Sequence, residues 1–205
     1  MNSENILKKL DILVPNPKCT LDYNKDYELL IAVMLSAQST DARVNIVTKE
    51  LFKYNLKELR DMDINKLEKI IMPVGTFHKK ALFIKNISKK LIEDYNGIVP
   101  NNRKYLESLS GVGHKTTNVV LSELYNEPCI AVDTHVTRVS KRLGLAKESD
   151  DVIKIERKLQ KRFPKENWSR LHLQLVTFGR HTCKAKNPLC NTCPFKNIEC
   201  KKPLN

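Results

Sequence analysis

Residues 109–116, with the sequence LSGVGHKT, constrain this chain more than any other feature. Two glycines one residue apart favour a tight hairpin, because glycine adopts positive φ without strain. A helix is expected to begin at His114, and the unpaired backbone N–H groups at its start form an anion site suited to a phosphate. Lys115 then lies in the first turn, where it can hold a phosphate or act as a nucleophile. Asp133 follows the lysine by eighteen positions.

Apolar residues recur at helical spacing along most of the chain, and strand-like alternation is nearly absent. Asp63 and Asp133 are expected N-caps, and Gly144 follows the expected end of a helix. The pattern predicts an all-α fold with two helical lobes and a cysteine-bearing C-terminal loop. The expected helices span residues 27–38, 40–52, 63–72, 77–95, 102–109, 114–125, 134–143, 150–163 and 167–181.

The same periodicity predicts which faces are buried. Residues 27–38 are apolar nearly all round and are expected to form a core helix. Ile46 belongs to the expected apolar face of residues 40–52, and Leu82 to that of residues 77–95. The lysines of the latter helix, Lys80 among them, are expected to lie mainly on its other faces.

Charge and composition indicate a protein that binds a polyanion, most often nucleic acid, and that works inside the cell. Lysine and arginine number 36 against 23 acids, a formal charge of 36 − 23 = +13, which is typical of a partner of a polyanion. The 205 residues suffice for one large domain or two small ones. We find no run of about 18 apolar residues that would span a membrane. The N-terminal stretch lacks the apolar block of a secretion signal, so we expect a cytoplasmic, nucleoid-associated location.

Four cysteines lie within eighteen residues, in the pattern Cys-x6-Cys-x2-Cys-x6-Cys. They are Cys183, Cys190, Cys193 and Cys200. In a reducing compartment such a polar, cysteine-rich segment is typical of a metal centre. The spacing alone leaves zinc and an iron–sulfur cluster open, since both accept four thiolates. Lys184 and Lys186 lie between these cysteines and are suited to backbone phosphates.

Taken together, three segments and the cysteines resemble the endonuclease III family of helix–hairpin–helix DNA glycosylases and AP lyases. The segments are LSGVGHKT, IAVDTHVTRVSKRLG at residues 130–144, and LSAQSTDARVN at residues 35–45. The resemblance runs from about residue 20 to residue 200. It implies a six-helix domain over residues 22–130, and a domain formed by residues 1–21 plus 131–205 that carries a 4Fe–4S cluster on the four cysteines.

The resemblance also implies a role for individual residues. Lys115 matches the Schiff-base lysine, Asp133 the catalytic aspartate, and Gln38 a glutamine that fills the gap left by the flipped base. The partner is double-stranded DNA with damaged or abasic sites, bound by a monomer, and oxidised pyrimidines are the expected lesions. The hairpin and the cysteine loop supply the remaining expected DNA contacts, which are Gly111, Gly113, His114, Thr116, Lys184 and Lys186.

The chemistry of these residues is consistent with that activity. An amine that attacks the anomeric carbon of the sugar displaces the base and forms an imine, and β-elimination of the 3′ phosphate follows. A carboxylate stabilises the cationic sugar and moves protons. Lys115 and Asp133 provide these two groups. Asp133 also serves as an N-cap, and the two roles are compatible.

Three departures from the family pattern stand out. The last cysteine spacing is six residues rather than the usual five, and Ser110 replaces a frequent proline in the hairpin. Some relatives insert a leucine into the duplex from the segment after a glycine, where this chain has Gly75-Thr76-Phe77. Phe77 or His78 is the candidate for this intercalating residue, the wedge.

Two other functions remain open from the sequence. One is an adenine mismatch glycosylase, although those relatives carry a catalytic glutamate where this chain has Ala32. The other is a non-catalytic DNA-binding protein that uses the hairpin only to hold phosphates.

Overall fold

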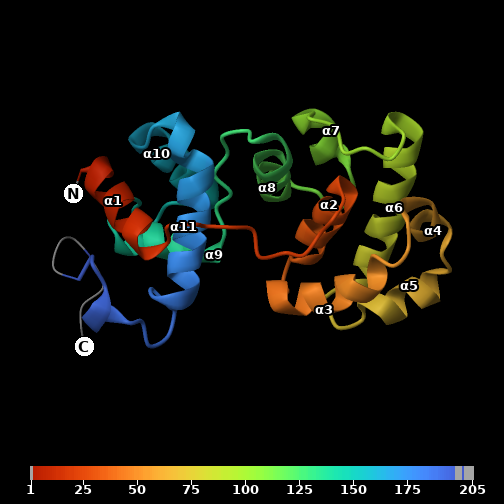
Figure 1. The fold of residues 1–205 in the computed structure, drawn as a ribbon, viewed down its shortest axis with the longest axis horizontal. Coiled ribbons are helices and arrows are strands. Elements are labelled where there is room, and N and C mark those ends of the chain that lie inside the picture. Colours follow the sequence, from red (N-terminus) through yellow and green to blue (C-terminus); the bar gives the residue numbers. More distant parts are fainter. Residues whose placement is uncertain (1, 197–199, 201–205) are drawn as a thin grey trace. The chain divides into compact units, whose positions relative to one another are not determined.

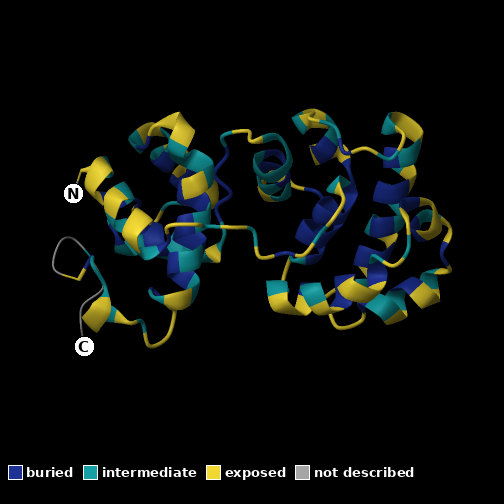
Figure 2. Ribbon diagram, viewed as in Figure 1, coloured by how far each residue is buried: buried dark blue, intermediate teal, exposed yellow. Residues whose placement is uncertain are grey.

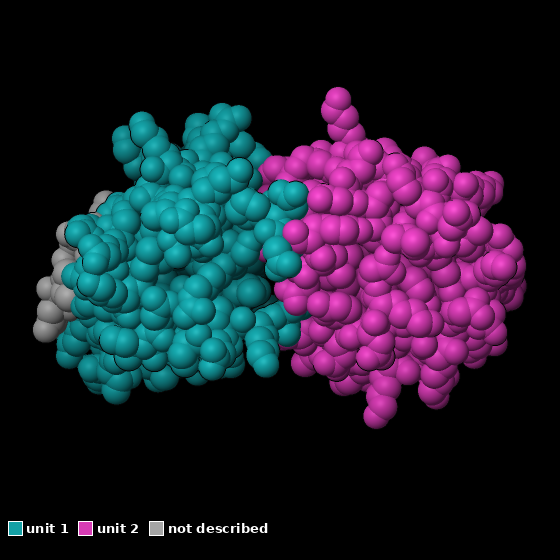
Figure 3. Space-filling view, turned by 45° about the horizontal axis from the view of Figure 1, so that its top comes forward, with its two compact units in different colours: residues 1–19, 126–205 teal, residues 20–125 magenta. Residues whose placement is uncertain are grey.

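A computed structural model describes residues 2–196 and 200 of the chain. Every regular element in that part is helical and none is a strand, which confirms the all-α prediction (Figure 1). The helices form two compact units, which Figure 3 colours separately: unit 1 comprises residues 1–19 and 126–205, and unit 2 comprises residues 20–125. The junctions lie two and five residues from the boundaries expected at residues 22 and 130.

Unit 2 is built around α2, Asp26–Leu35, whose residues from Tyr27 onward are all buried, as predicted (Figure 2). The longest helix described in this unit, α6 (Phe77–Tyr95), packs against α2, α4 (Leu56–Asp61) and α5 (Ile64–Ile71). Both predicted bounds of α6 are confirmed, and the helix ends where Asn96 and Gly97 adopt positive φ. The other helices of this unit are α3 (Asp41–Leu51), α4 (Leu56–Asp61), α5 (Ile64–Ile71), α6 (Phe77–Tyr95), α7 (Arg103–Ser108) and α8 (His114–Tyr125).

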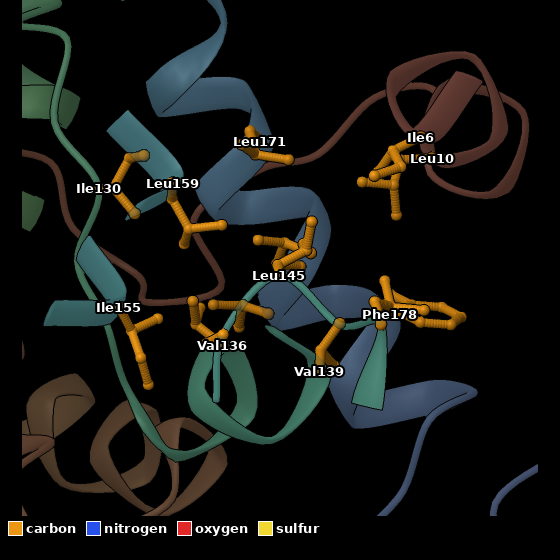
Figure 4. Packing of buried hydrophobic residues seen from close by; sticks show 14 of the residues in the cluster. Ile6, Leu10, Ile130, Val136, Val139, Leu145, Ile155, Leu159, Leu171 and Phe178 are labelled. Carbon is orange, nitrogen blue, oxygen red and sulfur yellow. The ribbon is translucent and has the colours of Figure 1, made fainter. Parts of the chain in front are cut away.

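Unit 1 has its own apolar core, drawn in Figure 4. α9 and α1 both pack against α11, and side chains such as Ile6, Val139 and Phe178 fill the space between them. Burying one such side chain contributes roughly 1.5–3 kcal/mol. The helices are α1 (Ser3–Leu13), α9 (Thr134–Arg142), α10 (Val152–Arg162) and α11 (Trp168–His181), with two short 3-10 turns at Lys165–Asn167 and Cys190–Thr192.

Two helices, α1 and the six-residue α4, were not predicted, although both have sequence signals. Asn55 caps α4 and exchanges hydrogen bonds with Glu58, which forms a capping box. Asn2 caps α1, whose buried Ile6 and Leu10 are one helical turn apart. Six helices were expected in unit 2, and α4 is the seventh.

Three expectations about burial were wrong. Ile46 is 72% exposed and Leu82 is 59% exposed, because each lies off the stripe that its helix turns toward the core. Lys80 is only 3% exposed, since it precedes Ile84 by four residues and shares the buried stripe of α6. In the described residues, no helix has both the length and the apolar character that a membrane span requires.

Candidate functional site: the hairpin and the cysteine loop

The turn between α7 and α8 contains two glycines, and the first of them, Gly111, is required by the fold. Gly111 has φ +77°, and a Cβ there would lie 2.4 Å from Cδ2 of Phe83. Val112 beside it is buried and anchors the turn. Ser110, which replaces the frequent proline, donates from Oγ to Oδ1 of Asn86 at 3.2 Å. The hairpin is therefore held against α6 on one side.

Gly113 differs from the expectation that both glycines relieve strain within the turn. Its φ lies outside the left-handed region, and no heavy atom lies within 4 Å of the Cβ position. The residue is exposed. The fold itself therefore places no demand for glycine here, and the bare backbone lies open to a ligand.

The first turn of α8 presents the predicted residues at the surface. Lys115 is exposed at the second position of the helix, and Thr116 is half-buried. His114 lies between two polar neighbours, with Nδ1 3.3 Å from Oε1 of Glu107 and Nε2 3.3 Å from Nδ2 of Asn118. The helix also begins with N–H groups that have no acceptor within the helix. This turn has the groups needed to bind a phosphate and to deliver an amine.

Asp133 lies in unit 1 and caps α9, as predicted. Its Oδ1 accepts a hydrogen bond from the backbone N–H of Val136 at 2.8 Å. The preceding Ile130, Ala131 and Val132 are buried, so the chain emerges from the core at the half-buried aspartate. Its carboxylate is thereby fixed on a rigid element.

Further along α9, the side chain of Arg138 connects this helix to α11 and to the cysteine loop. Arg138 donates from Nη2 to Gly179 O at 2.8 Å and from Nε to Cys183 O at 3.0 Å, and its Nη2 lies 3.1 Å from Nδ1 of His135. Burial lowers the pKa of His135 and favours the neutral ring. A Cβ on Gly179 would lie 2.9 Å from Cβ of His135, so α9 and α11 pack closely.

The four predicted cysteines line one cavity in unit 1. Burial raises the pKa of the Cys193 thiol. The hydrogen bond with the Phe195 backbone opposes this rise, and the neighbouring thiols of Cys183, Cys200 and Cys190 each raise the pKa by a smaller amount. Soft sulfur donors gathered in this way match the ligand sets of zinc and of iron–sulfur clusters. In residues 2–196 and 200, no three His, Cys, Asp or Glu side chains are already arranged around a metal position.

Arg142, at the end of α9, holds the beginning of the cysteine loop. Its Nη1 lies 2.7 Å from Lys184 O and 3.4 Å from Cys183 Sγ, and its Nη2 lies 3.4 Å from Ala185 O. The side chains of Lys184 and Lys186 are exposed beside these contacts. Arg138 and Arg142 are four residues apart and therefore lie on one face of α9. This spacing was the sequence signal for their contacts with the loop, which were not predicted.

Residues 194 and 195 of the cysteine loop are held by α1 and α11. Lys9 donates from Nζ to Pro194 O at 2.6 Å, and Phe195 packs edge-on against Phe178 with ring centroids 5.4 Å apart. Phe195 is fully buried. The loop is therefore fastened to three helices of unit 1.

Gln38 lies in an exposed turn of unit 2 with φ +58°, a conformation uncommon outside glycine. The candidate wedge residues begin α6: the rings of Phe77 and His78 are stacked at a tilt with centroids 4.0 Å apart, and His78 pairs with Glu68 at 2.9 Å. Phe77 is half-buried and His78 is exposed. The contact with Glu68 holds the His78 ring at the surface.

Comparison with known proteins agrees with this geometry. Residues 31–165 match the profile of the HhH-GPD superfamily base excision DNA repair proteins. Endonuclease III of Bacillus subtilis is 46% identical over 197 residues, covering 95% of this chain and 90% of that protein. Endonuclease III of Haemophilus influenzae is 42% identical over 202 residues, covering 95% of each.

Solved structures give the same result. A non-covalent endonuclease III–DNA complex superposes with a TM-score of 0.93 at 44% identity, covering 97% of this chain and 93% of that one. A trapped endonuclease III–DNA covalent intermediate superposes with a TM-score of 0.89 at 44% identity, covering 95% and 93%. The chain therefore belongs to the endonuclease III family of helix–hairpin–helix base excision repair proteins.

Proposed function

We propose that this chain is a bifunctional DNA glycosylase and AP lyase that removes damaged, chiefly oxidised, pyrimidines from double-stranded DNA. The observation that carries the proposal is the exposed Lys115 at the start of α8, immediately after the open backbone at Gly113. A phosphate bound at the hairpin brings the sugar of the damaged nucleotide within reach of the amine. A relative captured as a covalent intermediate with DNA supports an imine route.

The reaction begins when neutral Lys115 Nζ attacks C1′ of the damaged nucleotide. The N-glycosidic bond breaks and its electron pair leaves with the base, which takes up a proton. Ring opening and loss of the amine proton give the imine. Removal of a proton from C2′ then expels the 3′ phosphate and cleaves the strand. Asp133, fixed by its cap hydrogen bond, stabilises the positive charge on the sugar and moves the protons.

Cys183, Cys190, Cys193 and Cys200 would hold a 4Fe–4S cluster in unit 1. Four thiols that share one cavity fit that group, and the guanidinium of Arg142 near Cys183 Sγ offsets part of their negative charge. When bound, the cluster supplies iron–sulfur bonds that cross-link the loop. The loop then presents Lys184 and Lys186 to the DNA backbone.

Among the alternatives, an adenine mismatch glycosylase is disfavoured by Ala32. This residue is fully buried inside α2, so no carboxylate is available at the position where those enzymes carry their glutamate.

The protein is expected to act as a monomer at the nucleoid.

Borohydride reduction with abasic duplex DNA tests the proposal. The wild-type protein should be trapped as a covalent adduct, and excision of an oxidised pyrimidine should exceed excision of adenine opposite guanine. A non-catalytic DNA-binding protein would bind the duplex and give no adduct. Excision restricted to mismatched adenine would favour the mismatch enzyme.

A further inference from the structure

Lys80 is a buried cation of unit 2 that plays no part in the chemistry above. Its Nζ donates to Leu35 O at 2.8 Å and to Ala37 O at 2.6 Å. Burial lowers the pKa of this amine. It forms no ion pair with any described residue, so the carbonyls at the C-terminal end of α2 carry its balancing charge. Burying an ammonium is unfavourable, and such contacts offset only part of that cost.

The turn that Lys80 holds is conformationally strained. Gln38 follows Ala37 with φ +58°, and Thr76 in a second exposed turn has φ +57°. A residue other than glycine is strained in this region, and the conformation persists only where its surroundings hold it. Strain of this kind is concentrated at functional sites.

The two strained turns are in contact with each other. The backbone N–H of Gly75 donates to Ser39 Oγ at 3.2 Å, and a Cβ on Gly75 would lie 3.5 Å from Gln38 O. Thr76 is also the N-cap residue of α6, the helix that carries Lys80. Lys80 therefore links the two turns. It lies on α6, which begins after Thr76, and it bonds the carbonyls of Leu35 and Ala37, which precede Gln38.

We propose that Lys80 is a positioning residue that fixes the Gln38 turn against the Gly75–Thr76 turn, so that both enter the duplex as one unit. The inference rests on the proposed function and on the role that the family resemblance implies for Gln38, which is to fill the space left by the extruded base. Lys80 lowers the cost of reaching the extruded state, because the strained conformation of Gln38 is already formed before DNA binds. It contacts neither the sugar nor the base.

The test compares Lys80→Met with wild type in two single-turnover reactions. Excision of an oxidised pyrimidine from a paired duplex requires base extrusion, and it should slow by about tenfold or more when the turn is misplaced. Cleavage at a preformed abasic site has no base to extrude, and its rate should change by less than about threefold. Lys80→Arg keeps two donors and should restore most of the excision rate. Lys79→Met removes an exposed charge from the same turn of α6 and should leave both single-turnover rates at the wild-type level.

A double-mutant cycle with Gln38→Ala separates positioning from a general loss of stability. Gln38→Ala alone should slow excision, and adding Lys80→Met should slow it little further, because both changes remove the same function. Fully additive effects would overturn the inference. Equal excision rates in wild type and Lys80→Met would also overturn it, whereas a wild type that is not trapped on abasic DNA would overturn the proposed function instead.

If Lys80→Met does not fold, Ser39→Ala decides, since an unchanged excision rate in that variant refutes the coupling of the turns.

Discussion

The two glycines of the hairpin should respond in opposite ways to the same substitution. In Gly111→Ala the new methyl group meets the Phe83 ring at 2.4 Å, and the backbone stays at φ +77°. The left-handed conformation costs about 1–2 kcal/mol. Overpacking costs about 1–3 kcal/mol. Lower entropy of the unfolded chain returns about 0.4–1 kcal/mol. We expect the free energy of unfolding to fall by about 1–5 kcal/mol.

Gly113→Ala adds the same methyl group where no atom lies within 4 Å and φ is not left-handed. Its stability should stay within about 0.5 kcal/mol of wild type or rise slightly. The methyl group instead separates a bound phosphate from the N–H donors of α8. A hydrogen bond to a charged group contributes about 1.5–3 kcal/mol, so affinity for DNA should fall by roughly ten- to a hundredfold.

Urea unfolding and fluorescence anisotropy on a duplex with a stable abasic analogue measure the two quantities. A Gly113→Ala protein that is as unstable as Gly111→Ala would refute the assignment of Gly113 to the ligand surface. So would wild-type affinity of Gly113→Ala for the duplex. Gly111→Ala provides the matched control, because its loss of stability reports the internal demand for glycine in the same turn.

Other changes probe the remaining parts of the proposed site. Lys115→Ala should abolish borohydride trapping and spare DNA binding, and a trapped variant would exclude this lysine as the nucleophile. Asp133→Asn should slow base excision strongly while circular dichroism stays unchanged, because asparagine caps a helix about as well as aspartate; an unfolded variant would indicate a purely structural role. The purified protein should be brown with about four irons per chain on metal analysis, one for each metal position of the cluster; Cys190→Ser should lose that iron, and one zinc without iron would exclude the cluster. Removing Lys184 and Lys186 together should reduce the slope of log K against log salt by about two units if both reach phosphates, and an unchanged slope would place the loop in solvent.

The sequence predicted the helical framework well where local signals were strong. The bounds of α6 and α8 match the structure, and Asp63 and Asp133 cap the helices that they were expected to cap. Caps and C-terminal glycines act through backbone hydrogen bonds within a few residues, so they are readable without the fold. The short α4 was missed because only two of its residues, Leu56 and Leu59, are buried, too few to give a clear period.

Features that depend on distant neighbours were not predictable in this way. A lysine in an amphipathic helix is ordinarily exposed, and Lys80 is buried because carbonyls 43 and 45 positions earlier accept its hydrogen bonds. The two glycines of the hairpin look equivalent in the sequence. They differ because Phe83, on another helix, lies against only one of them.

In unit 1, α9 connects the proposed catalytic residue Asp133 to the cysteine loop, which is proposed to bind phosphate. The helix begins at Asp133, and Arg138 and Arg142 further along it donate to the carbonyls of Cys183 and Lys184. From residue 183 to residue 196, only Cys183 and Phe195 are buried, so apolar packing contributes little to the loop. Cross-linking through the four thiols would therefore add to the rigidity that the hydrogen bonds of Arg138, Arg142 and Lys9 provide. A phosphate held by that loop would then be positioned relative to the Asp133 carboxylate through a single rigid helix.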